Sequence, residues 1–199
     1  MYKFADDGGN VLKELDQAGF QAINAVGGEV AKKHTCMIAK EDGLPMMPIG
    51  SGTFVQIGNQ LFVATAKHLL DQFRADELVG IYWGEQDNRL GVTRENAILD
   101  EKLDLAAIPM PADTGAYGVS LGCLQPDHLG GESDLFVVSG IPSEKCKVDR
   151  TSRTVAVGHC SLGLMSLPLE SWPTNPELAI SPDVDMFFNY SEDLAINGN

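Results

Sequence analysis

Positively charged residues are scarce in this chain of 199 residues. Lys and Arg together number 14 against 28 Asp and Glu, which gives a formal net charge of −14, and neither Lys nor Arg occurs from Ser171 to Asn199. Binding to nucleic acid or to an anionic membrane surface depends on clustered cations. The composition therefore predicts no nucleic-acid and no membrane partner. The acidic excess favours solubility, with an electrostatic preference for basic partners as the alternative.

Several other signals are missing. No stretch approaches the roughly 18 apolar residues that a membrane-spanning helix needs, and the acidic start of the chain, which has no apolar segment behind it, does not resemble a signal peptide. We therefore expect a cytoplasmic protein. Paired Cys-x-x-Cys, His-rich metal motifs and phosphate-loop lysines are also lacking, so neither a metal nor a cofactor is predicted. We expect free thiols at all four cysteines: Cys36, Cys123, Cys146 and Cys160.

The pattern of apolar and turn-forming residues changes after the first 33 residues. Apolar residues at three- and four-residue steps, from Leu12 to Val26, predict one amphipathic helix over 10–33. Short runs rich in Val, Ile, Thr and Phe follow, separated by turn residues, and a single short helix is predicted at 66–73. Many short strands without regular helices between them favour an antiparallel sandwich or barrel. The predicted strands are 34–39, 49–57, 60–65, 78–83, 91–99, 103–110, 134–140, 154–160 and 185–190.

The most informative segment reads GSGTFVQIGNQLFVATAKH and covers residues 50–68. Gly58-Asn59 predicts a two-residue hairpin turn between two strands, and His68 follows the second strand at the start of the short helix. A histidine fixed on a rigid frame suits a general base. The segment resembles the "GSG…TAAH" stretch of trypsin-like (chymotrypsin-fold) serine peptidases, with Lys67 where the second alanine usually stands.

Two further landmarks follow in the order that this family requires. Leu103 to Ile108 reads LDLAAI and resembles the strand start that bears the family's aspartate, here Asp104. Its apolar neighbours predict a buried carboxylate, which needs a partner, and His68 is the natural one. Asp100 is the second candidate for the family's aspartate, but it is not followed by a run of small apolar residues as Asp104 is. Residues 135–142, LFVVSGIP, resemble the strand that opens the second barrel in bacterial members, which makes Ser139 a strand residue rather than the nucleophile.

The resemblance implies a mainly β, chymotrypsin-like double β-barrel with an N-terminal helix. Residues 1–33 would form a helical extension, 34–133 the first barrel carrying His68 and Asp104, and 134–199 an incomplete second barrel. It implies a serine endopeptidase that hydrolyses peptide bonds of a protein substrate, with His68 as general base and Asp104 as its orienting carboxylate. A regulatory protein partner is also expected.

The family's nucleophile motif, G-x-S-G, does not occur in this sequence. Three explanations stay open: the chain is a piece of a longer protease, it is a catalytically inactive pseudo-protease acting as an interaction module, or another residue is the nucleophile. For the last, Cys160 in GHCSLG is the best candidate, although Leu162 stands where the family has glycine and a strand-end cysteine is the simpler interpretation. Ser161 and Ser191 have less context. By itself, the chain is expected to hydrolyse peptides negligibly.

Overall fold

The computed structural model describes most of the chain between residues 17 and 120 and shorter stretches on either side. The described residues are 2–5, 11–15, 17–40, 46–84, 88–120, 122, 135–142, 146–149, 154–156, 160–166, 188–189 and 195–196. The chain forms two compact units. One comprises Met1–Gly28, Gln125–Val138 and Ser161–Asn197, and the other comprises Glu29–Leu124, Ser139–Cys160 and Gly198–Asn199.

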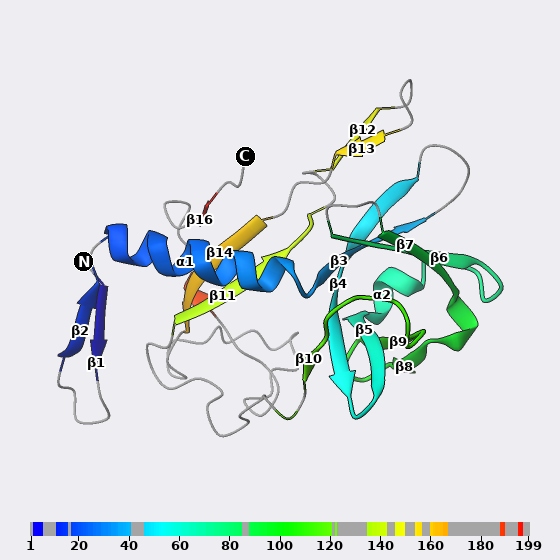
Figure 1. Cartoon of the computed structure of the whole chain (residues 1–199), viewed down its shortest axis with the longest axis horizontal. Helices are drawn as coiled ribbons and strands as arrows, with labels where there is room; N and C mark the ends of the chain where they lie inside the picture. The colour runs from blue at the N-terminus through cyan, green and yellow to red at the C-terminus, as the bar shows by residue number, and fades with distance from the viewer. Residues whose placement is uncertain are drawn as a thin grey trace, which may run out of the picture. The chain divides into compact units, whose positions relative to one another are not determined.

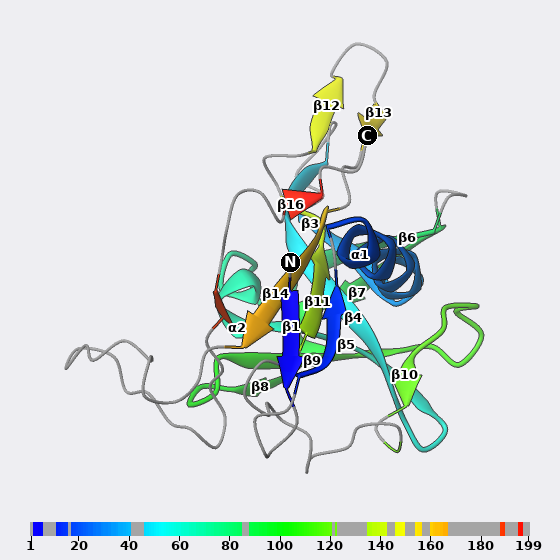
Figure 2. The ribbon, with the colours of Figure 1, turned by 90° about the vertical axis from the view of Figure 1, so that its left-hand side faces the viewer.

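The second unit is built on one curled sheet that forms a half-barrel (Figures 1 and 2). Its main strands follow the order β7-β6-β3-β4-β5-β9-β8, and each neighbouring pair is antiparallel. A two-residue strand, β10, adds a parallel pairing to β4. The bounds are β3 Thr35–Lys40, β4 Met47–Ile57, β5 Gln60–Ala66, β6 Leu78–Trp83, β7 Asn88–Thr93, β8 Ile98–Asp100, β9 Leu105–Met110 and β10 Val119–Ser120. The helix α2 covers Lys67–Leu70, and a 3₁₀ turn, η1, covers Arg94–Asn96.

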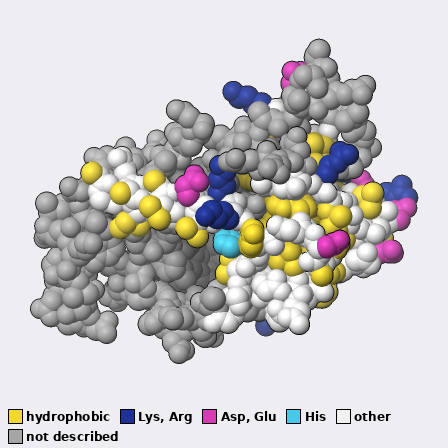
Figure 3. Space-filling view, viewed as in Figure 1, with side chains coloured by type: hydrophobic (Ala, Val, Ile, Leu, Met, Phe, Trp, Pro, Cys, Tyr) yellow, Lys and Arg dark blue, Asp and Glu magenta, His cyan; other side chains and the backbone are white. Residues whose placement is uncertain are grey.

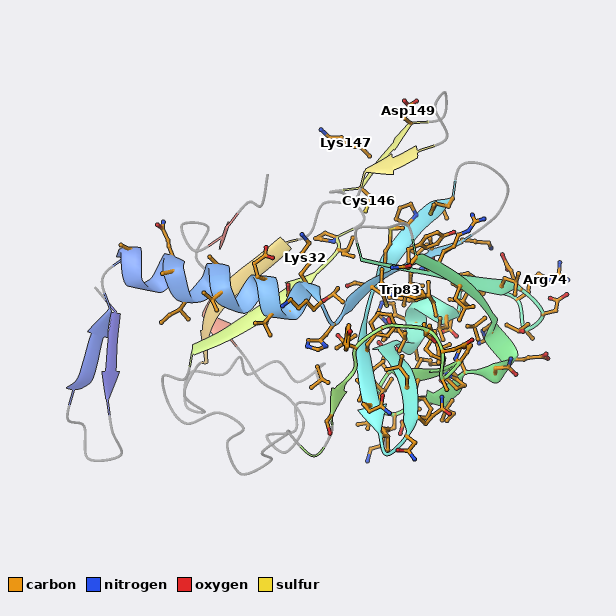
Figure 4. All side chains as sticks on the ribbon, viewed as in Figure 1. Lys32, Arg74, Trp83, Cys146, Lys147 and Asp149 are labelled. Carbon is orange, nitrogen blue, oxygen red and sulfur yellow. The ribbon has the colours of Figure 1, made fainter. Side chains whose placement is uncertain are left out.

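Alternating apolar residues explain the core of the half-barrel. Along β5 and β9 every second side chain is buried, as the two-residue period of a strand requires. Phe54, which is fully buried, meets the Trp83 ring edge-on with the ring centres 5.6 Å apart. Trp83 lies among the side chains gathered inside the half-barrel (Figure 4). The core contains Cys36, Ile38, Phe54, Leu61, Val63, Leu70, Phe73, Val79, Ile81, Ala106, Ile108 and Met110.

Strand β3 is buried on both faces. Cys36 and Ile38 face the main core, whereas Met37 and Ala39 pack with Ile141 in a second apolar cluster. Burial raises the pKa of the Cys36 thiol to about 12. A thiol is reactive only as the thiolate, so Cys36 is a structural residue.

The predicted hairpin between β4 and β5 is present. Ile57 pairs with Gln60 across the turn, and Gly58 has φ of +58°. Asn59 is not among the described residues with positive φ, so the turn has the glycine-first pattern of type II′ rather than type I′. This turn sets the register that carries β5 toward His68.

The N-terminal helix is shorter than predicted. Helix α1 covers Gln17–Lys32, while Val11–Leu15 forms a strand, β2, that pairs with β1, Tyr2–Ala5. Leu12 and Leu15 are spaced as on one face of a helix, but the pattern of five residues is too short to distinguish a helix from a strand. Residues 11–15 form a strand because they pair with β1. Figure 3 shows apolar side chains along α1; Ile23, Val26 and Val30 are exposed.

The other described strands form two small sheets. In one, β11 (Leu135–Gly140), β14 (Cys160–Ser166) and β15 (Phe188–Asn189) follow in that order, and β16 (Ala195–Ile196) pairs with β14. In the other, β12 (Lys147–Asp149) pairs with β13 (Thr154–Ala156).

The mainly β class is confirmed, in the form of one half-barrel. The chymotrypsin-like double barrel stays a prediction, and the predicted boundary at 133/134 falls outside the described residues. Within the part of the chain that the structure describes, no helix is both long and apolar enough to span a membrane.

Candidate functional site

His68 is held at the junction between β5 and α2. Strand β5 ends at Ala66, and α2 begins with Lys67 and contacts both β5 and β9. Just before the junction, the buried hydroxyl of Thr65 donates a hydrogen bond of 2.9 Å to the carbonyl of Ser51 on β4. This bond fixes the end of β5, so the direction in which the chain enters α2 is set by the sheet.

Asp104 is presented by a tight turn that precedes β9. The Asp100 carboxylate accepts hydrogen bonds from the backbone N–H groups of Lys102 (2.9 Å) and Leu103 (3.0 Å), which folds residues 101–104. Asp104 has φ of +49° and is the only described non-glycine residue with positive φ. Aspartate tolerates this left-handed conformation better than most residues. Because Asp104 lies in this turn, its side chain does not follow the in–out alternation of strand β9 and points toward α2.

The structure brings the two predicted side chains, 36 residues apart, into direct contact. The His68 ring nitrogen Nδ1 lies 2.6 Å from Asp104 Oδ2, and the His68 backbone N–H donates to Oδ1 over 2.9 Å. The Asp104 carbonyl also accepts the backbone N–H of Lys67 at 2.8 Å. Both carboxylate oxygens therefore bind one residue, which fixes the carboxylate against rotation.

Electrostatics at this contact assign the proton. The hydrogen bonds from the His68 side chain and backbone lower the pKa of Asp104, and the nearby positive charge of Lys67 acts in the same direction, against a smaller effect of desolvation. The carboxylate is thus ionised and only accepts, so Nδ1 carries the hydrogen. In the neutral imidazole, Nε2 is then the basic nitrogen, and no described residue hydrogen-bonds to it.

The expected burial of Asp104 is wrong. The side chains of His68 and Asp104 are 65% and 52% exposed, and Leu103 and Leu105 are also exposed. The reason is the turn: Ala106 and Ile108 point into the core, whereas Asp104 lies in the turn before β9 and Leu105 lies on the outward face of that strand. The contact is held by hydrogen bonding rather than by an apolar environment.

A chain of alternating charges surrounds α2. Lys67 Nζ contacts Asp71 at 2.9 Å and Glu101 at 2.8 Å, and Arg94 reaches Asp71 at 3.4 Å. Arg94 also donates from Nε to the Leu70 carbonyl at 2.9 Å. A helix of four residues has little stability of its own, so α2 depends on Asp104 at its first turn and on Arg94 at its end.

The glycines of the GSG motif provide space. A Cβ on Gly50 would lie 2.6 Å from a methyl group of Leu69 on α2, and a Cβ on Gly52 would lie 2.5 Å from Val63 and 3.2 Å from the Cys36 sulfur. Real Cβ contacts under 3.0 Å essentially do not occur. Glycine at position 50 thus allows α2 to approach β4.

The remaining candidate residues do not join this site in the described structure. Asp100 supports the turn and does not contact His68. Ser139 lies in strand β11, as predicted. Cys160 and Ser161 lie at the start of β14, with their side chains outside the described part, and Ser191 lies outside the described residues altogether.

Sequence reasoning missed the ion pairs of Lys67. The spacing of Lys67 and Asp71 within a predicted helix was a usable signal, since residues four apart on a helix are neighbours. The contacts of Lys67 with Glu101 and of Asp71 with Arg94 join residues far apart in sequence, and no pattern marks them.

A cavity of about 380 Å³ lies away from these side chains. It is lined by residues of β7 and η1 together with the start of β5 and the end of β9, whereas His68 and Asp104 lie beyond the opposite ends of β5 and β9. Among the described residues, no group of three or more His, Cys, Asp or Glu side chains is placed to hold a metal ion.

Comparisons with known proteins give no assignment. No protein-family model matches the chain. No curated protein matches it either.

Proposed function

We propose that this chain carries the His–Asp part of a trypsin-like serine endopeptidase active site, with His68 as general base and Asp104 as the residue that orients it. The observation that supports the proposal is the contact of 2.6 Å between His68 Nδ1 and Asp104 Oδ2. It leaves Nε2 as the basic nitrogen on an exposed ring. The two residues follow the family's order along the chain, and they lie just beyond the ends of β5 and β9 in a curled β-sheet.

In the proposed reaction, Nε2 of His68 removes the proton from the attacking hydroxyl as that oxygen bonds to the carbonyl carbon of the substrate. The imidazolium that forms is stabilised by the Asp104 carboxylate, which keeps its negative charge. His68 then donates the same proton to the leaving amine as the peptide bond breaks, and a water repeats the cycle to release the acyl group. The attacking serine is not identified among the described residues. The proposed substrate is a protein, and regulation by a protein partner is part of the proposal.

The second candidate function is a pseudo-protease that binds a protein without cleaving it. The absence of a G-x-S-G motif from the sequence favours it. In that case the His68–Asp104 contact would serve to hold α2 against the turn at 101–104. The two functions differ in whether removal of the imidazole changes catalysis.

The decisive experiment measures hydrolysis of a fluorogenic peptide library by the natural protein that contains this chain. We expect Asp104→Asn to lower kcat by about 10⁴-fold and His68→Ala by about 10⁶-fold, as loss of the orienting carboxylate or of the base does in such triads. Asp113→Asn, which removes an equal charge from an exposed position, is the control and should leave kcat unchanged. Cleavage that survives both site variants would refute the proposed enzyme, and a natural protein that binds a partner without any cleavage would support the pseudo-protease.

Cys160 as an alternative nucleophile has its own test. Alkylation of Cys160 by a thiol-directed electrophile is compared in the natural protein and in His68→Ala. A thiol activated by this imidazole would react several-fold more slowly without it. Equal rates would exclude His68 as its base.

A further inference from the structure

We propose that Lys67 is a positioning residue that, together with Glu101, holds the turn 101–104 so that the Asp104 carboxylate stays on His68. The inference rests on the proposed function for its catalytic meaning, although the contact itself can be measured without any catalysis. Lys67 stands where the family resemblance has a small alanine, so a device of this kind would be specific to this chain.

Lys67 binds both ends of the turn. Its backbone N–H donates to the carbonyl of Asp104, the last turn residue, over 2.8 Å. Its ammonium group contacts the carboxylate of Glu101, the first turn residue, at 2.8 Å. The residue that follows Lys67 is His68, which binds the Asp104 side chain. One residue therefore connects the base, its carboxylate and the beginning of the turn between them.

The ammonium group is itself held in place. Asp71, one helical turn further along α2, contacts Nζ at 2.9 Å, and Arg94 contacts Asp71 from η1. The Lys67 side chain is only 16% exposed, whereas Glu101 is 78% exposed. The pKa of Lys67 is raised, chiefly by its hydrogen bonds to Glu101 and Asp71. Lys67 is thus the less exposed partner of the pair, and it contacts the turn at its exposed first residue.

Such restraint matters because the turn is strained and exposed. Asp104 has positive φ, and its side chain is half exposed, so no apolar packing holds the carboxylate in place. The fraction of time that Asp104 contacts His68 then depends on how often the turn adopts this conformation. Exposed ion pairs contribute little to global stability, so loss of the Lys67–Glu101 pair should loosen the turn without unfolding the half-barrel.

Two readouts in the intact chain report the contact directly. Proton NMR detects the His68 Nδ1–H, and hydrogen exchange measures protection of the backbone N–H groups of Lys67 and His68, whose acceptors are both on Asp104. Amides of Val63 and Ile108, which pair in the β5–β9 ladder, report global stability. The variants are Lys67→Met and Glu101→Gln. Lys102→Met is the matched control, because it removes a positive charge from the same turn without removing an ion pair seen in the described structure.

We expect Lys67→Met and Glu101→Gln to weaken or abolish the Nδ1–H resonance and to speed exchange at 67 and 68 several-fold, while Val63 and Ile108 keep their protection. Lys67→Arg should restore both readouts, and the double variant should add little to either single change. The proposal fails if Lys67→Met behaves like Lys102→Met, or if exchange rises equally in the β5–β9 ladder. Failure of the peptidase proposal would appear instead as peptide hydrolysis that is insensitive to His68→Ala, with the NMR contact intact.

Discussion

Leu69 occupies the space that a side chain at position 50 would need. A Cβ on Gly50 would lie 2.6 Å from one Leu69 methyl group and 3.3 Å from the other. Leu69 follows His68 on α2, so the glycine in β4 and the imidazole are coupled through one neighbouring side chain. The GSG motif thereby contributes to the placement of His68 as well as to the strand.

Gly50→Ala should therefore force the Leu69 side chain on α2 to shift. We expect a loss of about 1 kcal/mol in the free energy of unfolding from overpacking, together with a weaker His68 Nδ1–H resonance in proton NMR. Gly91→Ala is the control: its Cβ would meet the nearest Leu78 atom at an ordinary 3.5 Å, so it should be neutral or slightly stabilising. Urea denaturation measures the change in the free energy of unfolding of each variant. Equal effects of the two variants would contradict the role assigned to Leu69.

Much of the half-barrel could be predicted from local pattern. Strand β6 has the predicted bounds, Leu78–Trp83, and the Gly58-Asn59 turn joins the strands that it was expected to join. Both signals are local: a run of β-forming residues, and a glycine where the chain needs positive φ. The predicted strand 91–99 is instead interrupted by η1, because Arg94 and Glu95 donate their backbone N–H groups to the carbonyls of Glu77 and Ala75, and no local pattern encodes these bonds.

The candidate site, too, could be predicted only in part from the sequence. The meeting of His68 and Asp104 was predicted from ordered landmarks, which carry information about distant residues that periodicity lacks. The exposure of Asp104 was not predicted, since its apolar neighbours suggested burial and only the turn geometry reverses this. The Lys67–Glu101 pair was also missed, because ion pairs between distant residues follow no sequence period.

Gly58 offers a test of the hairpin that leads to His68. Its φ is +58°, and a Cβ there would meet nothing within 4 Å, so substitution acts through backbone strain alone. We expect Gly58→Ala to cost about 1 kcal/mol and Gly58→Asn to cost less, because asparagine tolerates positive φ. Thermal or urea unfolding measures the difference. A loss that is the same for alanine and asparagine would mean that strain at this turn is not the cause.

Acid should weaken the Asp104 contact. The pKa of this carboxyl is lowered from its ordinary value of 3.8 by its hydrogen bonds with His68, so its stabilising effect is fully present above that value and is lost as the pH falls through the lowered one. Asparagine at 104 keeps the left-handed backbone and removes the charge. The difference in stability between the wild type and Asp104→Asn should shrink as the pH falls from about 5 to below 4, where denaturation curves can be compared. A difference that grows toward low pH would reverse the assigned sign.

The buried thiol of Cys36 should report the stability of the half-barrel from within. Its pKa of about 12, raised by burial, leaves on the order of one thiol in 10⁴ ionised at pH 8, and the side chain is fully buried. Labelling of Cys36 should then occur only when the sheet opens. Cys146 is half-buried and its thiol donates to the Pro142 carbonyl, so it should react much faster. Mass spectrometry of native protein at increasing urea measures both rates, and Cys36 labelling should track unfolding measured by circular dichroism. Rapid labelling of Cys36 without denaturant would mean that β3 is not enclosed on both faces.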